Sequence, residues 1–477
     1  MPQPLHIRQS IAWMLLACIV GWPVGTAAAV RLPGIFGNHL VVQRGQPVPV
    51  WGWANPGETV VVEFAGQTVG TQTGDDGRWK VELTACKVGP PSDLTVKGSS
   101  GEAVALKDVL VGDVWLCSGQ SNMQWTFNAG QGVMNNDAEV AAANYPDVRM
   151  FTVARTAAPK PSADVKGEWL PITPANLRVG GTDGASALAY FFGRELHQRL
   201  GVPIGLVNAS VGGTAAERWT SRTALEAHPS LRSLADEDGA STLYNGMIAP
   251  LIPYAIRGAI WYQGEDNTAR AYQYRTLFPA MIAQWRADWG QGDLPFGFVQ
   301  LAPCRYKPLA PECCAELREA QTMTLQSTPN TGMAVTMDVG DVNNIHPKNK
   351  QEVGRRLALW AMAKVYGRRI EYSGPIYRSM AVDGDRIRVE FTHVGDGLVS
   401  SDGKPLSNFT IAGEDRQFVP AAAEVDGRSI VVHSDQVAKP IAVRYAWRDD
   451  ATPNLANRDG LPASPFRTDA WKGVTEP

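Results

Sequence analysis

The sequence has no long basic run, and outside its first residues it has no long hydrophobic stretch. Its 477 residues carry 44 Lys and Arg against 47 Asp and Glu, for a net charge of -3. The basic runs are no longer than pairs such as Arg355-Arg356, so the basic face that duplex binding needs is missing and we expect no nucleic-acid partner. Beyond residue 29 no segment approaches 18 uninterrupted apolar residues, which excludes a membrane span in the mature chain.

Cysteine is also scarce. Six cysteines occur in the chain, and those beyond residue 29 are Cys86, Cys117, Cys304, Cys313 and Cys314. No histidine stands beside them at ligand spacing, so we expect no metal site. In an oxidising compartment Cys304 is expected to pair with Cys313 or Cys314 across a short loop. Cys117 ends an apolar segment and is expected to be a buried free thiol.

The first 29 residues have the pattern of an export signal. His6 and Arg8 make a weakly basic start, Ile11 to Val20 form an apolar core, and Ala27-Ala28-Ala29 offer a small-residue cleavage site. We expect cleavage after Ala29 and a soluble protein that is periplasmic or secreted.

Three zones follow, at residues 30–107, 108–368 and 369–477. The first and last alternate apolar and polar residues between turns, which predicts a small β-sandwich before the middle zone and a second β-domain after it. The middle zone alternates apolar runs with amphipathic segments, which predicts an α/β domain with a mostly parallel sheet. Its expected strands are Val109–Leu116, Ile204–Ala209, Gly258–Tyr262, Phe296–Leu301 and Met333–Met337, and its expected helices are Ala187–Leu200, Tyr272–Trp289, Ala315–Ser327 and Lys350–Val365.

Ser121 is the candidate nucleophile. It lies in Gly119-Gln120-Ser121-Asn122-Met123, directly after the first of these strands. In an open α/β sheet ligands bind at the carboxyl ends of the strands, where such a turn exposes its side chain. A Gly-x-Ser tripeptide is common in loops, so the remainder of the chain must supply a base.

Two further strand ends carry groups suited to an oxyanion. Ser210-Val211-Gly212-Gly213-Thr214 is a glycine turn whose amides can donate hydrogen bonds, although a tight turn that needs glycine for backbone reasons explains it as well. Gln263, in Gln263-Gly264-Glu265-Asp266-Asn267, can add a side-chain amide, while Glu265 and Asp266 fit helix capping and the helix dipole.

His346 is the histidine placed to act as general base. It follows the last expected strand and precedes a helix, in the loop layer expected to hold Ser121, and a serine hydroxyl needs such a partner near neutral pH. A carboxylate usually holds the base imidazole in one tautomer. Asp341 and Asp338 are the local candidates for that carboxylate.

Taken together, these blocks resemble the ordered motifs of the SGNH/GDSL-type hydrolases, and more closely the sialate O-acetylesterases. The resemblance runs from about Leu32 through Thr468 and includes the Gly119–Met123 motif, the Val211–Thr214 turn, the Trp261–Glu265 segment and the Asp341–Pro347 loop. It implies a three-layer SGNH-type α/β/α core with a mostly parallel sheet, flanked by N-terminal and C-terminal β-sandwich-like domains.

The resemblance also implies an enzyme that hydrolyses acetyl esters on sugars through a serine acyl-enzyme, without metal or organic cofactor. Ser121 would be the nucleophile, His346 the base, and the amides of Ser121 and Gly213 with the Gln263 side chain the oxyanion donors. The superfamily often has Asp three residues before the His, where this chain has Asn343. The acid is therefore Asp341, Asp338, or absent in a Ser/His dyad.

Two alternatives stay open. The acetylated substrate can be sialic acid or a plant polysaccharide such as xylan or xyloglucan. The chain could also be a non-catalytic glycan-binding protein with a hydrolase-like core, since it has two β-zones and 15 Trp. Exposed Trp often stacks on sugar rings, although a core position explains any single Trp better.

Overall fold

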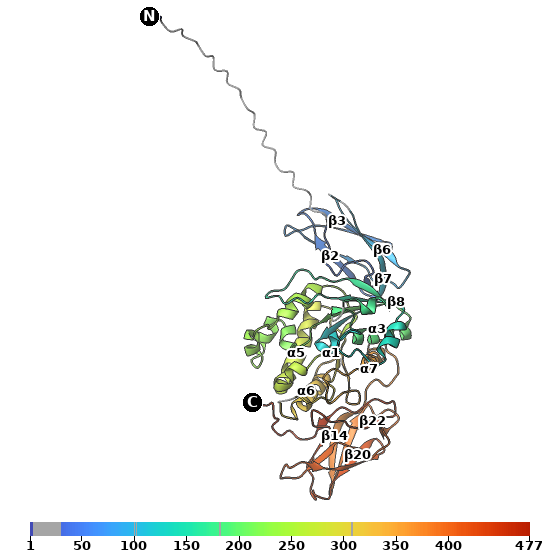
Figure 1. The fold of residues 1–477 in the computed structure, drawn as a ribbon, viewed down its shortest axis with the longest axis vertical. Helices are drawn as coiled ribbons and strands as arrows, with labels where there is room; N and C mark the ends of the chain where they lie inside the picture. The colour runs from blue at the N-terminus through green and yellow to red at the C-terminus, as the bar shows by residue number, and fades with distance from the viewer. Residues whose placement is uncertain (3–29, 100, 102, 181–182, 307–308) are drawn as a thin grey trace.

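In the computed structural model the chain forms an elongated molecule in which two β-rich ends flank an α/β centre (Figure 1). The structure describes residues 1–2, 30–99, 101, 103–180, 183–306 and 309–477. The expected mixed α/β core with additional β-sheet regions is confirmed. The expected export signal, residues 1–29, lies outside the described residues except for its first two positions.

The centre is built on a sheet with strand order β13-β12-β11-β7-β10-β8-β9. Neighbouring strands from β13 to β8 are parallel, and β9 pairs antiparallel with β8 at the edge. The strands are β7 (Val104–Gly119), β8 (Tyr145–Thr152), β9 (Trp169–Ile172), β10 (Ile204–Ser210), β11 (Gly258–Tyr262), β12 (Phe296–Val299) and β13 (Thr331–Ala334).

All five strands expected from apolar runs are present, because strands buried on both faces form continuous apolar stretches. β10, β11 and β12 are buried along their whole length. Two further strands, β8 and β9, were not predicted. β8 begins with three intermediate or exposed residues, as a strand near the sheet edge does, so its apolar run is short.

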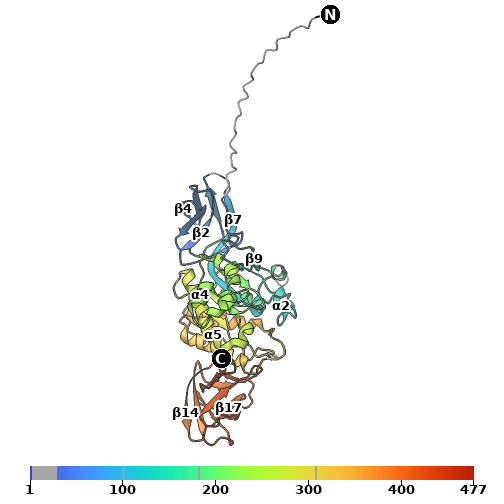
Figure 2. The same ribbon diagram turned by 90° about the vertical axis from the view of Figure 1, so that its left-hand side faces the viewer.

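Helices cover both faces of this sheet (Figure 2). Trp360 of α7 packs where a Cβ on Gly297 of β12 would lie, whereas the ring of Phe278 of α5 contacts that of Phe298. Successive strand residues point to opposite faces, so α7 and α5 lie on opposite sides. The helices are α1 (Ser121–Gln124), α2 (Asn136–Ala141), α3 (Ala187–Leu200), α4 (Arg222–Ala227), α5 (Ala271–Trp289), α6 (Cys313–Ser327) and α7 (Lys350–Lys364).

β7 joins the N-terminal β region to the centre without a break. Its first residues pair antiparallel with β6, its middle pairs with β1 at Leu110, and Asp113 to Gly119 pair with β10. The expected boundary between residues 107 and 108 therefore falls inside a strand. The N-terminal strands are β1 (Val41–Gln43), β2 (Val48–Trp53), β3 (Thr59–Phe64), β4 (Gln67–Gln72), β5 (Arg78–Leu83) and β6 (Ser92–Gly98).

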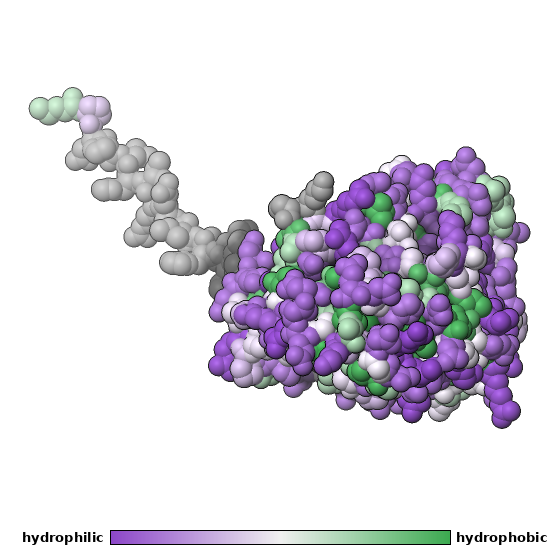
Figure 3. Space-filling view, turned by 90° about the horizontal axis from the view of Figure 1, so that it is seen from below, coloured by the Kyte–Doolittle hydropathy of each residue, from purple (hydrophilic) through white to green (hydrophobic). Residues whose placement is uncertain are grey.

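The C-terminal region consists of short strands in separate small sheets. Seen from the C-terminal end, the molecular surface is mainly hydrophilic with small apolar areas (Figure 3). Among the described residues, no helix combines the length and the apolar character needed to cross a membrane. The strands are β14 (Ile376–Asp383), β15 (Arg386–Thr392), β16 (Leu398–Ser400), β17 (Phe409–Ala412), β18 (Val419–Pro420), β19 (Ala422–Asp426), β20 (Ser429–His433), β21 (Ala442–Tyr445), β22 (Leu455–Asn457) and β23 (Phe466–Arg467).

The expected disulfide is wrong for this structure. Cys304, Cys313 and Cys314 are all free and buried. Asp449 of the C-terminal region binds the segment that carries Cys304 and the segment that carries Cys314. Its carbonyl accepts from the Cys304 amide at 3.0 Å, and its Oδ1 accepts from the Cys314 amide at 2.8 Å. A residue from another part of the chain thus links the two segments that carry these cysteines. The expectation that Cys117 is a buried free thiol is confirmed.

Candidate active site

Ser121 lies where β7 ends and α1 begins. Gly119 has φ of +140°, and a Cβ on it would come within 2.2 Å of the Tyr262 carbonyl oxygen. That oxygen accepts a hydrogen bond from the Gln120 amide at 2.9 Å. The neighbouring strand β11 therefore leaves room for glycine alone at position 119, and the turn brings Ser121 above the carboxyl end of the sheet.

The structure brings His346 to Ser121. Nε2 of His346 lies 2.9 Å from Oγ of Ser121, which is hydrogen-bond distance. The loop between β13 and α7 carries His346, and the side chain of Asn344 accepts from its amide at 2.9 Å. Asn122, next to Ser121, donates to the Ile345 carbonyl at 2.9 Å and ties this loop to α1.

His346 is neutral near pH 7. Burial lowers the pKa of its imidazole, and the positive charge of Lys350 lowers it further, to about 4. Both causes disfavour the protonated ring. A neutral imidazole can accept the hydroxyl proton of Ser121.

Trp125 holds the imidazole from one side. The two rings are stacked, with centroids 4.3 Å apart and planes inclined by 24°. Trp125 is itself fixed, since its Nε1 donates to the Gly132 carbonyl at 2.9 Å. Sequence reasoning missed this contact, although Trp125 follows the nucleophile by only four residues.

Neither expected acid reaches His346. Asp338 forms a two-pronged ion pair with Arg356, with both N···O distances 2.6 Å. Asp341 Oδ1 accepts from the amide of Asn343 at 2.9 Å. Within the described part of the chain, neither of these two carboxylates is hydrogen-bonded to Nδ1 of His346. Asp338 is held instead by the buried Arg356, which also pairs with Glu352 at 2.8 Å.

The glycine turn after β10 lies against Ser121. A Cβ on Gly212 would approach Ser121 Cβ to 3.2 Å, and the Gly212 amide donates to Oε1 of Gln124 at 2.6 Å. Gly213 has φ of +67°. The backbone amides of Ser121 and Gly213 donate to no other described residue, so both can serve an oxyanion.

The Gln263 side chain does not offer a third donor in this arrangement. It is fully buried, and its Nε2 donates to the Thr214 carbonyl at 3.2 Å and to Asn267 Oδ1 at 2.6 Å. A side-chain amide has two N–H groups, and both are in use. Gln263 instead fixes the Thr214 end of the glycine turn through its hydrogen bond to the Thr214 carbonyl.

A buried polar cluster beneath the dyad was not predicted. Lys350 is buried, and its Nζ donates to Asn122 Oδ1 at 2.5 Å, while Asn122 Nδ2 donates to Glu265 Oε1 at 2.6 Å. Burial lowers the pKa of Lys350 to about 7 and raises that of Glu265 to about 7. A lysine in a first helical turn gives no sequence signal of burial.

Within the described residues no group of three or more His, Cys, Asp and Glu forms a possible metal site.

A cavity of about 370 Å³ opens next to α1, with Gln124 but neither Ser121 nor His346 in its wall, and its volume is within the usual size range of small-molecule sites. Gln124 of α1 lines it together with Asn208 and Ser210 from the end of β10 and Arg155 and Asp183 from the loops beyond β8. Arg155 and Asp183 form an ion pair. The cavity therefore lies at the carboxyl ends of the parallel strands β8 and β10, the edge of an open α/β sheet at which ligands bind.

Comparisons with known proteins agree with this geometry. Residues 111–363 match the family model for carbohydrate esterase, sialic acid-specific acetylesterase. The sialate O-acetylesterase of Rattus norvegicus is 31% identical over 509 residues, which cover 92% of this chain and 93% of that protein. That of Homo sapiens is 31% identical over 487 residues, covering 91% and 92%.

Among solved structures, a carbohydrate acetylesterase from Xanthomonas citri matches with a TM-score of 0.86 and 42% identity. The match covers 93% of this chain and all of that one, and so includes both β-rich ends. The chain belongs to the carbohydrate esterase family of sialic acid-specific acetylesterases.

Proposed function

We propose that Ser121 and His346 form the catalytic dyad of a carbohydrate O-acetylesterase. Membership of the family makes the chain an ester hydrolase of this class. The observation that carries the assignment of the dyad is the 2.9 Å contact between Ser121 Oγ and His346 Nε2 at the carboxyl end of the parallel sheet. A nucleophile and its base need this separation for proton transfer.

In the proposed reaction Oγ of Ser121 attacks the acetyl carbonyl carbon while its proton passes to Nε2 of His346. The amides of Ser121 and Gly213 stabilise the oxyanion of the tetrahedral intermediate. As the intermediate collapses, the C–O bond to the sugar breaks and His346 returns its proton to the departing sugar oxygen. A water, deprotonated by His346, then attacks the acetyl-serine and releases acetate and free Ser121.

His346 works in this scheme without a carboxylate partner. Stacking on Trp125 orients the ring, and its low pKa keeps the ring neutral between proton transfers. Gln263 is a positioning residue, because its hydrogen bond to the Thr214 carbonyl fixes the turn that carries Gly213.

We place the sugar in the cavity next to α1, with Asn208, Ser210 and Arg155 as candidate contacts. The names of the relatives support two substrate classes, since two are sialate O-acetylesterases and one is a carbohydrate acetylesterase. O-acetylated sialic acid is the first candidate. Acetylated xylan or xyloglucan oligosaccharides are the alternative, and a carboxylate on the sugar is what distinguishes the two.

The test is acetate release by the purified chain from O-acetylated sialic acid, acetylated xylo-oligosaccharides and acetylated xyloglucan fragments. We expect one class to be hydrolysed at least about tenfold faster than the others. Ser121→Ala should lower that rate by three orders of magnitude or more, in line with the loss of other serine nucleophiles. A Ser121→Ala variant with undiminished activity would instead favour a glycan-binding protein.

We further propose a three-layer SGNH-type α/β/α core at residues 108–368 between β-sandwich-like domains at 30–107 and 369–477. The helices on both faces of the sheet support this three-layer core.

The N-terminal pattern supports export after cleavage at Ala29, to the periplasm or the medium. Expression of the full gene followed by N-terminal sequencing of the mature protein tests this, and a retained Met1 would contradict it.

A further inference from the structure

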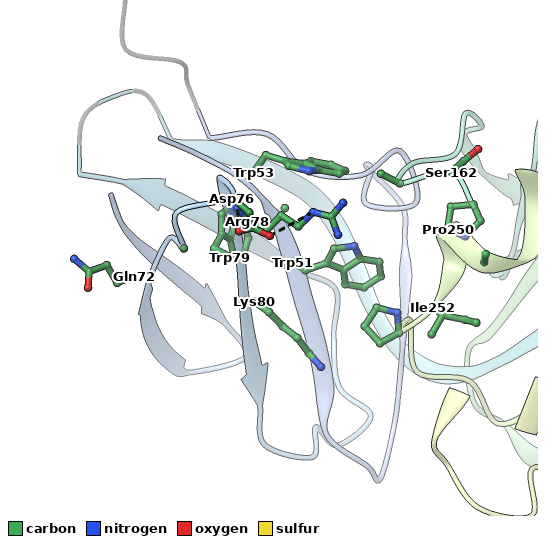
Figure 4. Close-up of a pocket in the computed structure, with 15 residues that line it drawn as sticks. Trp51, Trp53, Gln72, Asp76, Arg78, Trp79, Lys80, Ser162, Pro250 and Ile252 are labelled. Carbon is green, nitrogen blue, oxygen red and sulfur yellow. Dashed lines mark hydrogen bonds and ion pairs between the residues drawn. The ribbon is translucent and has the colours of Figure 1, made fainter. Parts of the chain in front are cut away.

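A second cavity lies far from the dyad, between the N-terminal β region and the centre (Figure 4). Its volume is about 610 Å³, and one wall is the β2-β5 ladder. The opposite wall comes from the loop at Ser162 and the segment around Pro250 and Ile252. Its size is that of a small-molecule site.

Two half-buried tryptophans form the β wall. Trp51 and Trp53 alternate with the buried Gly52 along β2, so their side chains project from the same face of the strand. Six other tryptophans differ in this respect, because their side chains are fully buried: Trp115, Trp169, Trp219, Trp261, Trp285 and Trp360. Two adjacent indoles left partly open in a cavity therefore suggest a ligand surface.

Both rings are held in place without a ligand. The Arg31 guanidinium lies 3.7 Å from the centroid of the Trp53 ring, and Asp164 pairs with Arg31 at 3.0 Å. The ring of Trp51 packs edge-on against Phe36, with centroids 4.8 Å apart. Because the rings are fixed beforehand, binding costs little side-chain entropy.

Polar groups surround the rings. Across the ladder Arg78 pairs in register with Trp53, and Lys80 with Trp51. Arg78 lies 3.8 Å from Asp76 in a solvent-exposed ion pair. Lys80 forms no ion pair with any described residue. Arg31 covers one face of the Trp53 ring, so a pyranose ring would stack its C–H face on the opposite face of that indole and on Trp51, with its hydroxyls toward the exposed donors and acceptors.

The cavity is too far from Ser121 to hold the sugar that is deacetylated. Trp51 contacts Tyr254, whose hydroxyl donates to the Val41 carbonyl at 2.6 Å, and Val41 pairs with Leu110 of β7. From Leu110 to Gly119 the strand advances about 30 Å, at about 3.3 Å per residue.

We propose that this cavity is a second carbohydrate-binding site, in which a pyranose ring stacks on Trp51 and Trp53 beside Arg78 and Lys80. This proposal rests on the proposed function only in one respect, namely that both sites would bind a glycan. The site anchors an oligosaccharide at the level of the middle of β7, independently of ester cleavage at the carboxyl end of that strand.

The test measures binding with the full chain carrying Ser121→Ala, so that no hydrolysis interferes. The probes are cellohexaose, xylohexaose and a trimer of α2,8-linked sialic acid, titrated by calorimetry. Trp53→Ala should lower the affinity for at least one probe tenfold or more, and Trp471→Ala, a half-buried tryptophan in the C-terminal region, serves as the matched control. An equal loss in both variants, or no binding of any probe, would overturn the proposal.

The exposed Lys80 provides a variant with little risk to folding. With Lys80→Gln, a loss confined to the sialic acid trimer identifies a carboxylate-bearing glycan, and a loss for the neutral hexaoses identifies a neutral one. In an active chain, Trp53→Ala should also lower the ratio of kcat/KM on an acetylated polymer to that on nitrophenyl acetate. Binding that depends on Trp53 in a chain without esterase activity would refute the proposed function alone.

Discussion

Strand β7 meets buried charge at two places and holds it in opposite ways. Near the middle of the strand Asp113 is fully buried and meets Arg44, Arg257, Gln43 and Tyr366. Burial alone raises the pKa of Asp113, but the hydrogen bond from Arg44 and the charges of both arginines outweigh it, so the pKa lies below its ordinary value. This charge is fully compensated.

At the carboxyl end the buried Lys350 meets the neutral amide of Asn122 rather than a carboxylate. Its charge is opposed only through space by Glu265, and it lowers the pKa of His346. The contrast shows how one strand can serve two purposes. Paired charges fasten the N-terminal region to the centre, and an incompletely paired charge tunes the reactive histidine.

The largest effect on stability is expected from Asp113→Ala. The substitution leaves Arg44 and Arg257 without their carboxylate, which costs about 3 kcal/mol of unfolding free energy. Urea unfolding followed by fluorescence measures it, with the exposed Asp75→Ala as control. A loss below about 1 kcal/mol would show that the junction does not depend on this cluster.

Trp125→Leu tests what orients the imidazole of His346 at the carboxyl end of β7. Without the stacked indole the ring of His346 is less well oriented, so kcat should fall about tenfold to a hundredfold with a smaller change in KM. Steady-state acetate release measures both constants, and Trp471→Leu is the control. Wild-type kcat in Trp125→Leu would mean that the loop alone orients His346.

Lys350→Met tests the charge beneath the dyad. Protonated His346 cannot accept the serine proton, so kcat/KM of the wild type should fall as the pH drops through about 4. Removing the positive charge raises the pKa of His346, and this acid limb should move up by as much as about one pH unit. A pH profile from 3.5 to 8 measures the shift.

The matched control for this profile is Lys348→Met, which removes an exposed lysine two residues away. It should leave the acid limb where it is. An unchanged limb in Lys350→Met, with the fold verified by circular dichroism, would show that burial alone sets the pKa of His346.

Asp341→Asn should have the smallest effect. Its carboxylate binds the Asn343 amide and not His346, so turnover should change by less than about threefold. Loss of a true triad carboxylate lowers turnover by orders of magnitude. A decrease of that size would mean that Asp341 reaches Nδ1 during the reaction.

Much of the site could be predicted because its residues lie at the ends of strongly apolar strands. Ser121, the glycine turn and His346 each follow a buried strand, and parallel strands bring their carboxyl ends to one edge. The missed features depend on contacts between distant segments. Trp125 over His346, Lys350 beneath Asn122 and the free state of Cys304 have no local pattern.

The sequence by itself was enough to predict the long helices and five strands of the centre, and to select Ser121 and His346 as candidate nucleophile and base, since apolar periodicity and glycine turns act over a few residues. The tertiary structure decided which charges are compensated. Asp338 pairs with Arg356, Gln263 is hydrogen-bonded to Asn267, and Asp113 pairs with two arginines. The reason is that leaving a buried polar group without a hydrogen-bond partner costs free energy, and only the fold determines which partners are within reach.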